Sequence, residues 1–160
     1  MPAVAPAGAH GRVMNSMNGR SFVDTNVVVY SVVENPDERV KHEAAIQLLT
    51  HEPDSLVIST QVLQEFYVVV TRKLAYPLDE ERAARALRGL ARLDVVGVDV
   101  PLVMAAVDTS RTAKLSLWDA LIIEAARQAG CARVYSEDLS DGQEIRGVKV
   151  ENPFRAAAAG

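Results

Sequence analysis

The chain has 160 residues, which is enough for one domain with a proper hydrophobic core. Apolar residues make up 49% of the sequence and charged residues 24%, a balance typical of a globular domain and not of a disordered chain. The formal net charge of −4 argues against broad electrostatic capture of nucleic acid, although it leaves room for a local basic face. The longest apolar run, Val27 to Val33, is too short for a membrane helix, so we expect a cytoplasmic protein without membrane contact.

The two ends of the chain differ in composition from its centre. Residues 1–20 are rich in Ala, Pro, Gly, Asn and Met without an apolar period, which predicts a flexible N-terminal extension. Residues 155–160 predict a short C-terminal tail. One folded domain is expected over residues 21–154, and Met14 and Met17 are alternatives for the true start of the chain.

In the first third of this domain, short apolar segments alternate with helical patterns. Residues 21–24 predict a strand. In residues 27–33 the β-branched side chains favour a continued strand, whereas the break at Asp24-Thr25-Asn26 favours a capped helix, which we prefer. A helix is predicted over 37–51 and a strand over 56–58, with the helix burying Val40, Ala44 and Leu48.

The remainder of the domain continues the alternation. Ser59 or Thr60 caps a helix to Leu74, and Asp79 caps another through Leu93. The segments that follow are a strand over 95–98, a helix from Asp99 and Pro101 to Lys114, a helix over 117–129 between Ser116 and Gly130, a strand over 132–136, and an edge strand over 148–150. This order predicts an α/β domain with a parallel sheet covered by helices.

Four acidic residues far apart in the sequence interrupt or end apolar stretches, where a carboxylate is costly unless something compensates it: Asp24, Glu65, Asp119 and Asp138. Each follows a predicted strand or lies in the first two turns of a predicted helix, so all four can face the carboxyl edge of the sheet. Two carboxylates about 5 Å apart repel by roughly 3 kcal/mol at an effective dielectric of 20, so such a cluster needs protons or cations. All-oxygen ligands predict Mg²⁺ or Mn²⁺ and, with it, hydrolysis of a nucleic-acid backbone.

Each acid also has an ordinary interpretation. Asp24 is compatible with a turn or cap, and Ser116 with Asp119 fits a capping box. Glu65 can extend to solvent from the edge of an apolar face, and the segment 137–141 can be a solvated loop. The joint placement of the four acids favours the metal site.

The sequence resembles the PIN domain family, and within it the VapC toxins of toxin–antitoxin pairs, over most of residues 22–154. The resemblance lies in five segments taken together in order: Phe22-Val23-Asp24-Thr25-Asn26, Gln64-Glu65-Phe66-Tyr67, Leu117-Trp118-Asp119-Ala120-Leu121-Ile122, Tyr135-Ser136-Glu137-Asp138-Leu139-Ser140-Asp141-Gly142-Gln143 and Val150-Glu151-Asn152-Pro153-Phe154. Family members start a few residues before the first Asp, which favours Met17 as the start.

The resemblance implies a three-layer α/β/α PIN-like fold with a central, mainly parallel sheet. It also implies a Mg²⁺- or Mn²⁺-dependent endoribonuclease toxin that cuts RNA phosphodiester bonds with a metal-activated water and leaves a 5′ phosphate and a 3′ hydroxyl. The implied partners are the RNA substrate, a cognate VapB-like antitoxin, and a second copy in a homodimer or higher toxin–antitoxin assembly. By position, the implied catalytic and metal-binding residues are Asp24, Glu65, Asp119 and Asp138, with Asp141 as a further metal ligand and Thr25 and Asn26 as polar neighbours.

Two other functions remain open at this point. A PIN-like scaffold can be a catalytically silent binding module whose acids only dock a partner. A DNA flap nuclease shares the chemistry, but it usually needs extra helical elements to grip duplex DNA, and none fits in this length.

Residues outside the acidic set have weaker signals. We expect Cys131 to be an inert buried thiol. The histidines lack the spacing of metal ligands: His10, His42 and His51. Trp118 predicts core packing, with base stacking as the alternative. Four arginines recur along one side of a predicted helix and suit either RNA phosphates, an acidic partner or a solvated surface: Arg82, Arg85, Arg88 and Arg92.

Overall fold

The computed structural model describes residues 19–155, so the predictions for residues 1–18 and 156–160, including His10 and the start residue, lie outside the described residues. The domain is built on one six-stranded sheet with the strand order β3-β2-β1-β4-β6-β5. All neighbouring strands run parallel except β5 and β6. The strand bounds are β1 Ser21–Val23, β2 Leu56–Ser59, β3 Asp94–Val96, β4 Arg133–Tyr135, β5 Glu144–Ile145 and β6 Val148–Glu151.

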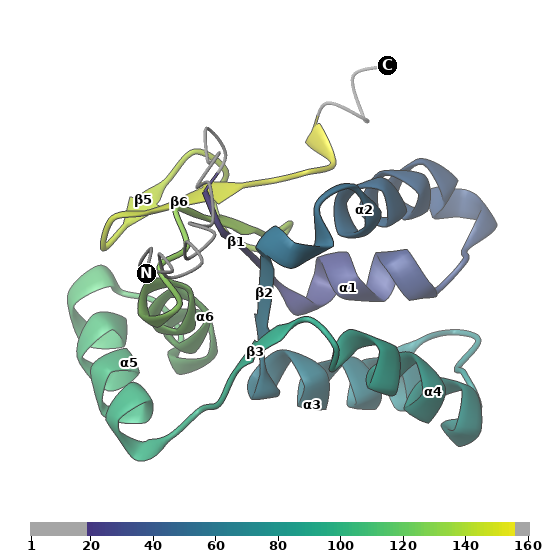
Figure 1. Cartoon of the computed structure of the whole chain (residues 1–160), viewed down its shortest axis with the longest axis horizontal. Helices are drawn as coiled ribbons and strands as arrows, with labels where there is room; N and C mark the ends of the chain where they lie inside the picture. The colour runs from purple at the N-terminus through teal and green to yellow at the C-terminus, as the bar shows by residue number, and fades with distance from the viewer. Residues whose placement is uncertain (1–18, 156–160) are drawn as a thin grey trace, which may run out of the picture.

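Helices cover both sides of this sheet and complete the predicted three-layer α/β/α architecture. Figure 1 shows α1 and α2 together on one side of the central strands and α5 and α6 together on the other, with α3 and α4 side by side. The helix bounds are α1 Thr25–Val32, α2 Arg39–His51, α3 Thr60–Val68, α4 Glu80–Leu90, α5 Val100–Ala113 and α6 Leu117–Gln128. A π-helical turn, Val69–Lys73, continues α3.

Five of the six α-helices begin at a capping side chain, and α2 is the exception among the described residues. The side chains of Asp24, Ser59, Asp79, Asp99 and Ser116 each accept a hydrogen bond from a free backbone N–H in the first turn of the helix that follows. At the other end of α6, Gly130 has a φ of +70°, a left-handed conformation that favours glycine. The caps at Asp24, Ser59 and Asp99 fix where β1, β2 and β3 give way to the helices that follow them.

The core lies between the sheet and its helices. β1 and β2 are buried on both faces, as expected for central parallel strands. The largest fully buried side chains include Phe22, Ile58, Phe66 and Ile123. The helix alternative for residues 27–33 is confirmed, because α1 starts directly after Asp24 and buries Val27 and Val28.

Several details of the sequence prediction are wrong. Val40 is 57% exposed, since α2 turns Ala45 rather than Val40 into the core. The helix predicted through Leu93 is α4, and it ends at Leu90. The helix predicted to Leu74 is α-helical only to Val68 and then continues as the π-helical turn. The predicted edge strand at residues 148–150 is β6, and it is not at the edge of the sheet, because β5 pairs with it in antiparallel orientation and forms the edge.

Within residues 19–155, no helix is both long and apolar enough to cross a membrane.

Candidate metal centre

Asp24 occupies the turn between β1 and α1, at the carboxyl end of a central strand. Its backbone N–H donates to the carbonyl of Tyr135 on β4 at 3.0 Å, which joins the ends of two neighbouring strands. Its carboxylate is nearly buried, and it accepts hydrogen bonds from the Thr25 backbone N–H at 2.7 Å and from Ser136 Oγ at 2.7 Å. From β1 the sheet continues through β2 and β3 on one side and through β4 on the other. Asp24 therefore lies at the switch point of the strand order, where ligands bind in open α/β sheets.

The electrostatics of Asp24 are those of a strained carboxylate. Burial raises the pKa of Asp24 to about 6, and the hydrogen bonds from Ser136 and Thr25 only partly offset this rise. The negative charges of Glu65 and Asp138 raise the pKa further. These three carboxylates therefore share one electrostatic environment, and a bound cation would stabilise their ionised forms.

Glu65 reaches the same place from the second turn of α3. Its Oε2 accepts a hydrogen bond from Thr25 Oγ1 at 2.8 Å, and its Oε1 accepts one from Gln61 Nε2 at 2.9 Å. Thr25 thus lies between Asp24 and Glu65, with its backbone N–H bound to one carboxylate and its hydroxyl to the other. A donor between two like charges lowers their mutual repulsion.

Asp138 joins the network from the loop after β4. Asn26 Nδ2 donates to Asp138 Oδ2 at 3.0 Å and lies 3.3 Å from Asp24 Oδ2, so one amide group bridges two carboxylates. Ser136 Oγ holds the loop by accepting hydrogen bonds from the backbone N–H groups of Asp138 and Leu139. Thr25 and Asn26, the predicted polar neighbours, thus both donate hydrogen bonds to the acidic residues.

The same loop is anchored from α2. Lys41 Nζ donates to Glu137 Oε1 at 2.6 Å and lies 5.1 Å from the ring centroid of Tyr30. The hydrogen bond to Glu137 is the main reason that the pKa of Lys41 is raised above its usual value. Because Glu137 precedes Asp138, this ion pair fixes the position of a candidate ligand from outside the acidic set.

Asp119 lies in the first turn of α6, as predicted. Its backbone N–H donates to Ser116 Oγ at 3.1 Å, which forms the Ser116 half of the capping box. Among the described residues, the Asp119 carboxylate forms no hydrogen bond, so it is not committed to a cap. Asp119 is linked to the other acids through the backbone of Trp118, whose carbonyl accepts a hydrogen bond from Gln61 at 3.2 Å.

Asp141 has different partners from the other acids. Its carboxylate accepts a hydrogen bond from the Asn152 backbone N–H at 2.7 Å and pairs with Arg155. Both contacts lower the pKa of Asp141. The structure therefore connects Asp141 to the segment after β6, whereas Asp24, Glu65 and Asp138 share one network.

The acidic side chains of the described residues are not arranged as a complete metal coordination sphere. In the part of the chain from residue 19 to residue 155, no three His, Cys, Asp or Glu side chains already lie close enough to hold a metal ion. The donor set nevertheless fits Mg²⁺ or Mn²⁺ in its chemistry, because it offers several carboxylate oxygens and no thiolate or imidazole. The raised pKa of Asp24 is the observation that favours a cation here.

Two polar residues of this network were missed as site residues in the sequence. Ser136 is fully buried at the end of β4 and binds Asp24, and Gln61 is 6% exposed and binds Glu65. The signals were available: Ser136 follows a predicted strand, and Gln61 precedes Glu65 by one helical turn.

The remaining sequence candidates lie outside the network. Trp118 is 63% exposed, so the prediction that it packs in the core is wrong. Cys131 is buried as predicted, and burial raises the pKa of its thiol to about 11. His42 Nδ1 lies 2.6 Å from the Tyr30 carbonyl. Arg82, Arg85 and Arg88 are exposed on α4, but Arg92 follows the end of that helix.

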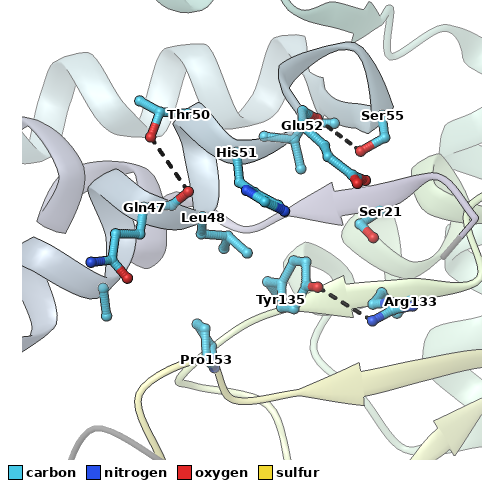
Figure 2. Close-up of a pocket in the computed structure, with 12 residues that line it drawn as sticks. Ser21, Gln47, Leu48, Thr50, His51, Glu52, Ser55, Arg133, Tyr135 and Pro153 are labelled. Carbon is cyan, nitrogen blue, oxygen red and sulfur yellow. Dashed lines mark hydrogen bonds between the residues drawn. The ribbon is translucent and has the colours of Figure 1, made fainter.

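A separate pocket of about 680 Å³ lies away from the acids (Figure 2). It is lined by residues at the start of three strands, Ser21, Leu56 and Arg133, and by the end of α2. None of the acidic candidate residues lines it. Parallel strands place their amino and carboxyl ends at opposite edges of a sheet, so the pocket is not the predicted site.

The model of the PIN domain family matches residues 21–140, which span all four acids. The chain belongs to the PIN domain family. Comparison with curated proteins finds no match.

Solved structures with a similar fold are VapC toxins and toxin–antitoxin complexes. VapC20 of Mycobacterium tuberculosis, described as a sarcin-ricin loop cleaving toxin, is 23% identical, with 74% of this chain and 89% of that chain covered and a TM-score of 0.59. A toxin–antitoxin complex from Klebsiella pneumoniae is 19% identical, with 84% and 98% covered and a TM-score of 0.64. The DNA-bound VapBC of Salmonella typhimurium is 20% identical, with 84% and 98% covered and a TM-score of 0.62. At these identities, the comparison establishes a shared fold.

Proposed function

We propose that this protein is a metal-dependent endoribonuclease toxin of the VapC type. Asp24, Glu65, Asp119 and Asp138 would hold Mg²⁺ or Mn²⁺ at the carboxyl edge of the sheet. The observation that carries the proposal is the buried Asp24 carboxylate, whose pKa is raised to about 6 by burial and by the charges of two other candidate ligands. A bound cation stabilises the ionised form of buried carboxylates that repel one another.

The chain's own residues orient the site. Thr25 and Asn26 orient the carboxylates by hydrogen bonds, and Ser136 fixes the loop that carries Asp138. When bound, the ion would supply the positive charge that activates a water and stabilises the developing charge on a phosphodiester. Substrate RNA would enter at this edge, where the exposed Asp138 and the partly exposed Asp119 meet solvent.

The proposal includes a protein partner. The structural neighbours from Klebsiella pneumoniae and Salmonella typhimurium are toxin–antitoxin complexes, which supports a cognate VapB-like antitoxin. The exposed arginines of α4 suit an acidic surface of such a partner or RNA phosphates. A copurification of the chain with the product of an adjacent small reading frame would test this part.

Asp119→Asn and Asp138→Asn are expected to reduce RNA cleavage by a hundredfold or more, because each removes a charged ligand of the ion. Thermal stability should change little, since neither carboxylate is buried. The measurement is cleavage of a defined RNA in Mn²⁺ and in EDTA, with circular dichroism as the control for folding. Cleavage that persists in EDTA would refute metal dependence.

The rival function is a catalytically silent PIN-like module. It predicts that the wild-type protein binds a partner but cleaves no RNA with any divalent metal. Full cleavage by the wild type, lost in both variants, would exclude this rival.

Trp118→Ala is expected to leave the free energy of unfolding within about 0.5 kcal/mol of the wild type, because the indole is 63% exposed. If the indole stacks on a base beside the cut bond, the KM for RNA should rise about 5- to 150-fold, since stacking contributes about 1–3 kcal/mol per base. Tyr76→Ala is the matched control, because Tyr76 is 90% exposed and lies between α3 and α4. Equal effects of the two substitutions on KM would contradict base stacking by Trp118.

A further inference from the structure

The side chain of Gln61 connects two of the helices that carry candidate ligands. It is buried in α3, one turn before Glu65. Its Nε2 donates to Glu65 Oε1 at 2.9 Å and to the backbone carbonyl of Trp118 at 3.2 Å. Because Trp118 directly precedes Asp119, one amide group joins the Glu65 carboxylate to the first turn of α6.

The partners of Gln61 fix the orientation of its amide. A carboxylate oxygen and a backbone carbonyl are both acceptors, so the NH₂ end must face them. The other end, Oε1, is buried and has no hydrogen-bond partner among the described residues. A buried acceptor without a donor costs free energy, and an apolar side chain of similar length would avoid that cost. Packing alone therefore does not account for glutamine at this position, whereas its donor end does.

Glu65 is held from two sides by this arrangement. Thr25 Oγ1 donates to one carboxylate oxygen and Gln61 Nε2 to the other, so a rotation of the Glu65 side chain would break at least one hydrogen bond. Residues that orient a metal ligand in this way usually change metal affinity or activity about 10- to 100-fold when they are replaced.

We propose that Gln61 is a positioning residue that fixes the Glu65 carboxylate relative to α6, so that Glu65 and Asp119 can share one divalent ion. The inference rests on the metal-dependent function proposed above. It assigns Gln61 no contact with the RNA or with the ion.

Gln61→Met tests the donor end, since methionine keeps the length of the side chain and removes the hydrogen bonds. Isothermal titration with Mn²⁺, without RNA, should give a dissociation constant about 10- to 100-fold higher than that of the wild type. The Mn²⁺ concentration for half-maximal cleavage should rise by the same factor, while kcat at saturating Mn²⁺ stays close to that of the wild type. The melting temperature in EDTA should change little, because removal of the unpaired Oε1 offsets the loss of the two hydrogen bonds.

Two further variants separate positioning from polarity and packing. Gln61→Asn keeps an amide that is one methylene too short to reach both acceptors, and it should weaken Mn²⁺ binding as Gln61→Met does. Gln64→Met is the matched control, because Gln64 is an exposed glutamine on the same helix. It should bind Mn²⁺ like the wild type.

The outcomes distinguish this inference from the function on which it rests. Wild-type Mn²⁺ binding together with unchanged affinity in Gln61→Met would overturn the role of Gln61 and leave the proposed function intact. No Mn²⁺ binding by the wild type at millimolar concentration would overturn both. Loss of the cooperative unfolding transition in both Gln61 variants would assign the side chain to folding and would also overturn the positioning role.

Discussion

Asp24→Asn is expected to abolish RNA cleavage and to stabilise the metal-free protein at the same time. The loss of activity should be roughly a thousandfold or more, because metal ligation supplies several kcal/mol of transition-state stabilisation. The gain in stability at pH 7 should be up to about 3 kcal/mol, since the pKa of Asp24 rises from 3.8 to about 6 on folding. Opposite effects on activity and stability are typical of a strained site.

The sign of the pH dependence follows from this rise. Between pH 3.8 and about 6, the folded protein keeps a proton on Asp24 that the unfolded chain has lost. The contribution of Asp24 to the free energy of unfolding therefore falls as the pH increases through this range and stays low above it. Urea denaturation in EDTA should show this decrease for the wild type and not for Asp24→Asn.

Asp79→Asn is the matched control for Asp24→Asn. Asp79 is also the N-cap of a helix, and its Oδ1 accepts a hydrogen bond from the Arg82 backbone N–H at 2.8 Å, but it is exposed. Asparagine is an equally good cap, so this substitution should change neither stability nor cleavage. A stability gain in Asp79→Asn as large as that in Asp24→Asn would contradict the role of burial.

The sequence was sufficient to predict the six α-helices, five of the six strands and the acids at their ends, but not the short edge strand β5. Local signals carried this information, since Asp24, Ser59, Asp79 and Ser116 act as caps wherever they lie in the fold. The resemblance to the PIN family was carried by the same segments. The helix at residues 27–33 shows the limit, because its β-branched composition favours a strand and only the cap decided against it.

What the sequence did not reveal depends on contacts between distant segments. Helical periodicity shows that α2 and α6 each have an apolar side, but not that Val40 and Trp118 face away from the sheet. Asp138 and Asp141 are three residues apart in one polar loop, and only the return of the chain after β6 brings Asn152 to Asp141. In the sequence, Gln61 is one more polar residue of a helix, and its role depends on the contact with the Trp118 carbonyl at the start of α6.

Addition of Mn²⁺ is expected to raise the melting temperature of the wild-type protein by about 5–10 °C at a hundredfold excess over the dissociation constant. An ion that binds only the folded state contributes about 2.7 kcal/mol at that excess, and each kcal/mol shifts a domain of this size by about 2–4 °C. The shift should be larger at pH 7.5 than at pH 5, because Asp24 must lose its proton to bind the ion and its pKa is raised to about 6. The measurement is a thermal melt with and without metal at both pH values.

The variants decide which carboxylates contribute to this shift. Asp24→Asn should lose most of it, and Asp79→Asn should keep all of it, since the exposed cap lies outside the network. Asp141→Asn tests the fifth candidate: it should keep the shift if the contacts of Asp141 with Asn152 and Arg155 persist when metal binds, and lose part of it if Asp141 turns to the ion. A wild-type melting temperature that does not respond to millimolar Mn²⁺ or Mg²⁺ would remove the metal site and, with it, the metal-activated water on which the proposed chemistry depends.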